Sequence, residues 1–208
     1  MKEIFLIGDS ISLHYHPYLK ELLNNKAVFQ RKGDEDDINL ALDHINEPLG
    51  ANGGDSALVL AYMNELKKKG KKYSIILFNC GLHDIRTDRM KHQKQIVEEE
   101  YQKNIQKILD IAKQIAHTVI WISTTPVDDD RHNNRENGYL RYNEDVLCYN
   151  RIANTIMREN KMEIIDLYTF TKNISVDKNE RYRDHVHFSD KVCKMQANYI
   201  YSCIEPLL

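Results

Sequence analysis

Short apolar runs alternate with longer segments of mixed polarity along the whole chain. The runs are rich in Ile, Leu, Val and Phe, a composition typical of strands buried in a sheet. They predict strands at Lys2–Ile7, Ala27–Arg31, Ser74–Asn79, Thr118–Ser123 and Glu163–Leu167. Each run is too short for a buried helix.

The segments between the runs carry apolar residues at helical spacing. Ile105, Ile108 and Leu109 are spaced to share one face of a helix. Asp55–Ser56 and Ser189 stand where side chains can cap the first turn of a helix. We expect helices around Tyr18–Leu23 after Pro17, from Ser56 to about Lys69, over Lys94–Ala116, over Tyr139–Asn160, and after Ser189 to about Ile204.

The remaining polar stretches are expected to be mostly loop. They cover Gly33–Gly54, Thr124–Gly138 and Asn173–His187. Apolar residues between positions 38 and 45 hint at a short helix within the first stretch. The loop Val127–Tyr139 is either solvated or lies over a substrate.

Strands that alternate with helices favour a parallel sheet covered on both faces. Right-handed crossovers then bring the carboxyl ends of the strands to one edge of the sheet, where ligands of such folds bind. Ser10, Gly81–Asp84 and Thr124–Pro126 all follow strand ends and so share this edge. Gly54 precedes a helix and can lie there too, and the loop that carries Asp184 and His187 can fold back over it.

Composition narrows the class of protein. The 208 residues are most simply a single domain, 1–208, with 42% hydrophobic and 29% charged residues. The formal net charge is −2, so nucleic acid and anionic membranes are poor candidate partners. The oligomeric state does not follow from these numbers.

The cysteines and the amino-terminal residues indicate the cellular compartment and whether a metal is expected. The four cysteines form no C-x-x-C pair, and no His or Cys spacing is typical of a metal site. The apolar run Ile4–Ile7 is too short for a signal peptide, and no stretch approaches the roughly 20 apolar residues of a membrane span. We therefore expect a cytoplasmic protein with no metal and no cofactor.

The candidate chemistry lies near the two ends of the chain. Gly8-Asp9-Ser10 follows the first strand, and Asp184 stands three residues before His187. A serine hydroxyl needs a base to take its proton, and an imidazole oriented by a carboxylate is such a base. Alternatively, Ser10 caps a helix, and Asp184 and His187 form a hydrogen-bonded pair within a loop. His185 competes as the base, although its position beside Asp184 makes side-chain pairing awkward.

These blocks resemble the GDSL, or SGNH, hydrolase superfamily. Gly8-Asp9-Ser10-Ile11 is similar to its first block and Asp184-His185-Val186-His187 to its last. Asn52–Ser56 looks like its glycine block, and Gly81-Leu82-His83-Asp84 stands where the family carries Gly-x-Asn-Asp. The resemblance implies a flavodoxin-like, three-layer α/β/α sandwich with about five parallel strands. It also implies ester hydrolysis by a Ser10, His187 and Asp184 triad.

The resemblance further implies donors for the oxyanion of the tetrahedral intermediate. They are the backbone N–H groups of Ser10 and Gly54 and the side chain at position 83, with Gly53 as an alternative to Gly54. His83 departs from the family's Asn. A neutral imidazole still donates one N–H, so His83 is an oxyanion donor, a structural residue, or a sign of a degenerate site.

The function expected from these residues is a serine esterase that removes a small, acetyl-like acyl group from a carbohydrate or another polar substrate. Acyl transfer by the same triad is one alternative, and a non-catalytic carbohydrate-binding module is another. A phosphate or nucleotide binder has little support, because G-x-x-x-x-G-K-[ST] and G-x-G-x-x-G are both absent.

Overall fold

Parallel strands form one sheet at the centre of the computed structural model, which describes residues 1–136 and 138–208. The strands are β1 (Lys2–Ile7), β2 (Ala27–Arg31), β3 (Tyr73–Phe78), β4 (Ala116–Ile122) and β5 (Glu163–Ile165). They lie in the order β2-β1-β3-β4-β5, and every pair is parallel. Each of these strands corresponds to one of the predicted apolar runs.

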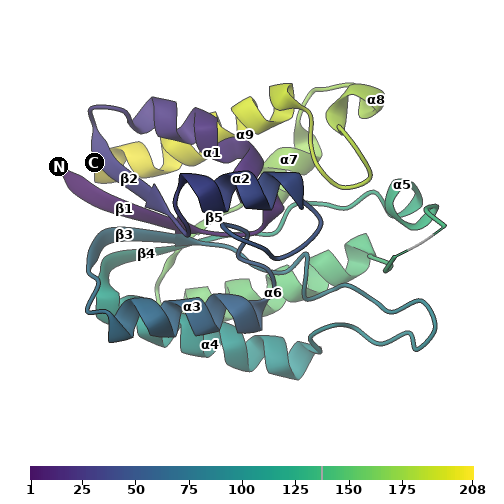
Figure 1. The fold of residues 1–208 in the computed structure, drawn as a ribbon, viewed down its shortest axis with the longest axis horizontal. Helices are drawn as coiled ribbons and strands as arrows, with labels where there is room; N and C mark the ends of the chain where they lie inside the picture. Colours follow the sequence, from purple (N-terminus) through teal and green to yellow (C-terminus); the bar gives the residue numbers. More distant parts are fainter. Residues whose placement is uncertain (137) are drawn as a thin grey trace.

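Helices cover both faces of this sheet (Figure 1). One layer holds α1 (Ser10–Leu23), α7 (Leu167–Asn173) and α9 (Asp190–Ile204). The other holds α3 (Ser56–Lys68), α4 (Glu98–Ile115) and α6 (Asn143–Glu159). Short helices lie in the loops: α2 (Glu35–Asp43), α5 (Asp129–Asn133) and α8 (Lys178–Arg181), with a 3-10 turn at Glu205–Leu207. The predicted α/β/α sandwich is confirmed.

The core lies between the sheet and these two layers. In α4 the buried side chains recur at helical spacing, as expected, and include Tyr101, Ile105, Ile108, Leu109, Ala112 and Ile115. Trp121 of β4 packs on Phe78 of β3, with ring centroids 5.1 Å apart. A buried side chain of this size contributes about 1.5–3 kcal/mol through burial, so the apolar pattern fixes which face of each element turns inward.

Three helix starts differ from the prediction. Helix α1 begins at Ser10, before Pro17, because the Asp9 carboxylate accepts a hydrogen bond from the Ile11 N–H at 3.0 Å and caps the first turn. Helices α4 and α6 begin at Glu98 and Asn143, four residues later than predicted. The residues before them instead form isolated bridges, in which Thr87 pairs with Lys94 and with Leu140.

Three short helices were not predicted: α5, α7 and α8. Each is capped by an aspartate, since Asp128, Asp166 and Asp177 accept hydrogen bonds from the first-turn N–H groups. They are too short to show a hydrophobic period, so only the cap was visible in the sequence. The predicted strand Glu163–Leu167 ends at Ile165 for the same reason, as Asp166 starts α7.

The chain ends lie side by side, away from the carboxyl ends of the strands (Figure 1). The Lys2 ammonium donates a hydrogen bond to the Leu207 carbonyl. Within residues 1–136 and 138–208, no helix is both long and apolar enough to cross a membrane.

The core predicts a matched pair of substitutions. Leu109 is 0% exposed and Leu147 is 42% exposed. Leu109→Ala should lower the free energy of unfolding by about 2–5 kcal/mol, because it removes buried methyl groups and leaves a cavity. Leu147→Ala should change it by less than about 0.5 kcal/mol. Urea unfolding measures both, and equal effects would contradict this core.

Candidate active site

The predicted sequence blocks lie together at the carboxyl edge of the sheet. Ser10 is the first residue of α1, directly after β1 and the turn Gly8-Asp9. The glycine block lies against this turn, because the Gly53 N–H donates to the Gly8 carbonyl at 2.8 Å. A Cβ at position 53 would stand 2.8 Å from that same oxygen, so only glycine permits the approach.

Two segments from opposite ends of the chain meet at Ser10. His187 Nε2 lies 2.9 Å from Ser10 Oγ, and His187 Nδ1 lies 2.6 Å from Asp184 Oδ2. The other carboxylate oxygen accepts the N–H groups of Val186 and His187, both at 2.8 Å. Burial alone raises the pKa of Asp184, but the His187 ring and these N–H groups outweigh it and hold the pKa well below its usual range. The carboxylate is therefore ionised and fixed toward the ring.

The other histidines near the edge point elsewhere. His185 Nδ1 lies 3.1 Å from His132 Nδ1, and its Nε2 lies 3.3 Å from the Arg135 guanidinium. Burial, and then Arg135, lowers the pKa of His185 to about 4. His14 stacks near His187, with ring centroids 5.0 Å apart. Among these imidazoles, His187 is the one hydrogen-bonded to Ser10.

The predicted oxyanion donors differ in whether their N–H groups are already hydrogen-bonded within the protein. Ser10 opens α1, so its N–H has no acceptor within the helix. The Gly54 N–H instead donates to Asn52 Oδ1 at 3.0 Å, and the alternative, Gly53, donates to Gly8. Both glycine donors are thus engaged within the protein, which the sequence did not indicate.

His83 is buried at this edge, with 1% of its surface exposed. Its Nε2 lies 3.4 Å from Arg86 Nη2, and since a guanidinium only donates, Nε2 is the acceptor and Nδ1 carries the proton. Nδ1 has no hydrogen-bond partner within residues 1–136 and 138–208. Burial, then the charges of Arg86 and Arg141, hold the pKa of His83 well below its usual range. The side chain is a neutral imidazole with one free donor.

Asp84 fixes the loop that carries His83. Both of its carboxylate oxygens accept the Ser56 N–H, at 2.9 and 3.1 Å, which ties the end of β3 to the start of α3. Burial raises the pKa of Asp84 to about 7. Asp84 therefore anchors this loop through backbone hydrogen bonds.

Arginines form a part of the site that sequence reasoning missed. Arg141 is 3% exposed and donates from Nε to the Leu82 carbonyl at 2.6 Å. The Tyr139 ring lies against Arg86 and Arg141, at 4.3 and 4.7 Å from ring centroid to guanidinium carbon. Arginine is ordinarily exposed, so no local pattern marked these positions.

Part of the segment after β4 lies against the loop that carries the candidate base. His132 and Arg135, from the predicted loop Val127–Tyr139, contact His185, two residues before His187. Ser10 is 5% exposed and His187 1% exposed, so both candidate catalytic residues are buried in this structure.

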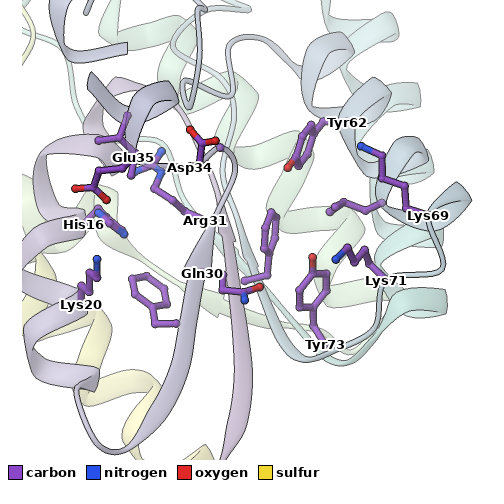
Figure 2. A pocket seen from close by; sticks show the side chains of 15 residues that line it. His16, Lys20, Gln30, Arg31, Asp34, Glu35, Tyr62, Lys69, Lys71 and Tyr73 are labelled. Carbon is purple, nitrogen blue, oxygen red and sulfur yellow. The ribbon is translucent and has the colours of Figure 1, made fainter. Parts of the chain in front are cut away.

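A separate cavity of about 430 Å³ lies around the edge strand β2 (Figure 2). His16, Lys20 and Arg31 line it on one side of the strand, and Tyr62 and Tyr73 on the other. None of the predicted site residues lines this cavity. The candidate chemistry is therefore at the carboxyl edge and not in this hollow.

Comparison with known proteins identifies the family. The model of the GDSL-like lipase/acylhydrolase family matches residues 4–200. The chain therefore belongs to this family of ester hydrolases. No curated protein matches the chain.

Solved structures share the fold at low sequence identity. A lipase/acylhydrolase from Enterococcus faecalis is 18% identical, with a TM-score of 0.62 and coverage of 100% of this chain and 97% of that one. A GDSL-like lipase from Bacteroides thetaiotaomicron is 15% identical, with a TM-score of 0.69 and coverage of 100% and 89%. A structure of an acetyl xylan esterase from Geobacillus stearothermophilus is 14% identical, with a TM-score of 0.61 and coverage of 97% and 93%.

Buried neutral histidines predict loss of stability in acid. Burial is the largest cause that lowers the pKa of His16 to about 3, of His132 to about 2, and of His14 and His185 to about 4. Below pH 6.5 the unfolded chain binds protons at these sites that the folded chain does not, so stability falls as the pH drops toward 4. His83, whose pKa burial also lowers, adds to this trend, whereas Asp84 and Asp9, whose pKa values burial raises, oppose it.

The measurement is the midpoint of thermal unfolding, Tm, between pH 7 and pH 5. Each such histidine changes the stability by up to about 1.4 kcal/mol per pH unit. His16→Gln should flatten the fall in Tm, whereas the exposed His117→Gln should leave it as in the wild type. A Tm independent of pH over this range would contradict the burial of these rings in the neutral form.

Proposed function

We propose that the protein is a serine esterase that removes a small acyl group, such as acetyl, from a polar substrate. The observation that carries the proposal is the chain of hydrogen bonds from Ser10 through His187 to Asp184. A nucleophile, a base and an orienting carboxylate in this order are the arrangement that acyl transfer to serine requires. Membership of the acylhydrolase family agrees with it.

In this mechanism Ser10 Oγ bonds to the ester carbonyl carbon while its proton passes to His187 Nε2. The tetrahedral intermediate collapses, the ester C–O bond breaks, and Nε2 gives the proton to the departing alkoxide. Water then attacks the acyl-serine and gives its proton to Nε2, and Ser10 leaves with that proton. Asp184 stabilises the transient imidazolium and holds its tautomer.

The oxyanion is held by the free donors near Ser10. These are the Ser10 N–H and the Nδ1–H of His83, which has no partner in the described part of the chain. Because His83 is neutral, it donates as the family's amide would, without adding a charge. The Gly54 N–H joins them only if Asn52 Oδ1 releases it.

A carbohydrate or another hydroxyl-rich molecule is the proposed acyl carrier. The acetyl xylan esterase with the same fold supports a small acyl group on a sugar. One further candidate is transfer of the acyl group to a sugar hydroxyl, because an alcohol can attack the same acyl-serine in place of water. Added sugar acceptors should then yield an acylated product, and its absence would remove the transferase candidate.

The nucleophile is tested with p-nitrophenyl acetate. Ser10→Ala should reduce kcat to the background of the uncatalysed reaction, because it removes the atom that forms the acyl-enzyme. Ser202→Ala, a substitution of an exposed serine in α9, is the matched control and should keep wild-type turnover. Appreciable turnover by Ser10→Ala would contradict the assignment of Ser10 as the nucleophile.

The role of His83 is tested by two replacements. His83→Ala should lower kcat about 10²–10³-fold if the imidazole donates to the oxyanion. His83→Asn restores an uncharged donor and should recover much of that loss. Thermal unfolding of both variants reports the fold, and an Asn variant as inactive as the Ala variant, with an intact fold, would show that the role is not donation.

A further inference from the structure

Three guanidinium groups surround one aromatic ring beside the candidate active site. The guanidinium carbons of Arg86, Arg141 and Arg135 lie 4.3, 4.7 and 5.6 Å from the centre of the Tyr139 ring. Within the described part of the chain, none of the three forms an ion pair with a carboxylate. Arg141 is buried and Arg86 and Arg135 are half-buried, and holding cations together with little water and no ion pair is costly.

The same groups have hydrogen-bond donors that the protein leaves unused. Arg141 Nη1, Arg86 Nε and His83 Nδ1 are all buried, and none has a hydrogen-bond partner among the residues that the structure describes. Arg141 itself is 3% exposed. Folded proteins satisfy about nine in ten or more of their buried polar groups, so three unused donors in one cluster point to a bound group.

The cluster adjoins the reacting atoms. Arg141 donates to the carbonyl of Leu82, the residue before the candidate oxyanion donor His83. Arg86 lies 3.4 Å from His83 Nε2. Arg135 contacts His185, two residues before the candidate base. A substrate held at Ser10 would therefore have these cations beside it.

The nearby carboxylates do not form ion pairs with the cluster in the described part of the chain. Asp184 is hydrogen-bonded to His187 and to backbone N–H groups. Asp9 Oδ1 caps α1, and its Oδ2 has no hydrogen-bond partner among the described residues. Burial raises the pKa of Asp9 although Arg141 acts against this. Asp9 and Asp55 attract the guanidinium groups from a distance, but neither makes a direct contact that occupies their donors.

We propose that the substrate of this site carries an anionic group, a carboxylate, phosphate or sulfate, that Arg141 and Arg86 bind beside the ester carbonyl held at Ser10. A guanidinium fork matches these oxyanions and gives strong, charge-assisted hydrogen bonds. The inference rests on the proposed esterase function and narrows its substrate class. The anion belongs either to the acyl group or to the alcohol.

Two matched pairs of esters distinguish the two sources. On the acyl side, p-nitrophenyl butyrate is compared with mono-p-nitrophenyl succinate, which replaces the terminal methyl with a carboxylate. On the alcohol side, phenyl acetate is compared with 4-acetoxybenzoate. One charged ester should have a kcat/KM at least about 10-fold above its neutral partner, and added salt should shrink the difference.

Substitutions of single arginines test which residues cause the preference for charged esters. Arg141→Gln should lower the ratio of charged to neutral kcat/KM about 30-fold, the effect of truncating one partner of a buried charge pair. Arg86→Gln, at a half-buried position, should lower it in the same direction if Arg141→Gln fails to fold. Arg158→Gln, at an exposed position in α6, is the control and should keep the wild-type ratio.

Binding supplies a readout that does not need turnover. Succinate or inorganic phosphate should raise the Tm of the wild type, but not of Arg141→Gln, relative to sodium chloride at equal ionic strength. Turnover of the neutral esters without a charged preference, and without this shift in Tm, overturns the inference and leaves the esterase intact. A shift in Tm without turnover of any ester supports the anion site and contradicts the proposed function. If there is neither ester turnover nor a shift in Tm, both the anion site and the proposed function are contradicted.

Discussion

The packing of α1 along α9 is the constraint on which the candidate site depends. Ser10 opens α1 and His187 stands three residues before α9, so the hydrogen bond between them joins positions 177 residues apart in the chain. The sheet sets where α1 begins, because β1 ends at Ile7 and the Asp9 carboxylate starts the helix at once. A shift of one helix along the other would move the imidazole away from the hydroxyl, because hydrogen-bond geometry tolerates only tenths of an ångström.

Burial sets the electrostatics of the edge. Little water reaches His83 and His132, so charges interact strongly there. Burial lowers the pKa of both rings, and neighbouring guanidinium groups lower it further. These neutral rings therefore lie beside arginine cations, and backbone N–H groups fix the carboxylate of Asp184 nearby. This combination is the basis of the proposed oxyanion donors and of the proposed anionic substrate.

His83 shows how the surroundings of a residue that departs from a family pattern can keep it uncharged. The family resemblance places an amide here, and an exposed histidine would titrate near neutral pH and change its charge during catalysis. Burial and two neighbouring arginines hold this ring in its uncharged form, and Arg86 selects the tautomer with the proton on Nδ1. The substitution and the arginines thus form one arrangement, which single-residue reasoning could not connect.

The sequence by itself determined the strands, the class of fold and the family, because apolar runs, aspartate caps and the GDSL blocks are local signals. Residue types, their spacing and the family resemblance made Ser10, Asp184 and His187 candidates. Only the tertiary structure decided which histidine meets Ser10, that Asn52 engages Gly54, and that Arg86 and Arg141 close on Tyr139. The Ser10–His187 and Arg86–Tyr139 contacts join residues far apart in the chain. The Asn52–Gly54 and Arg141–Tyr139 contacts are local, but they depend on how the loops fold at the carboxyl edge, which no local pattern contains. Helices α4 and α6 start later than predicted for a similar reason, because Lys94 and Leu140, which precede them, pair with Thr87 instead.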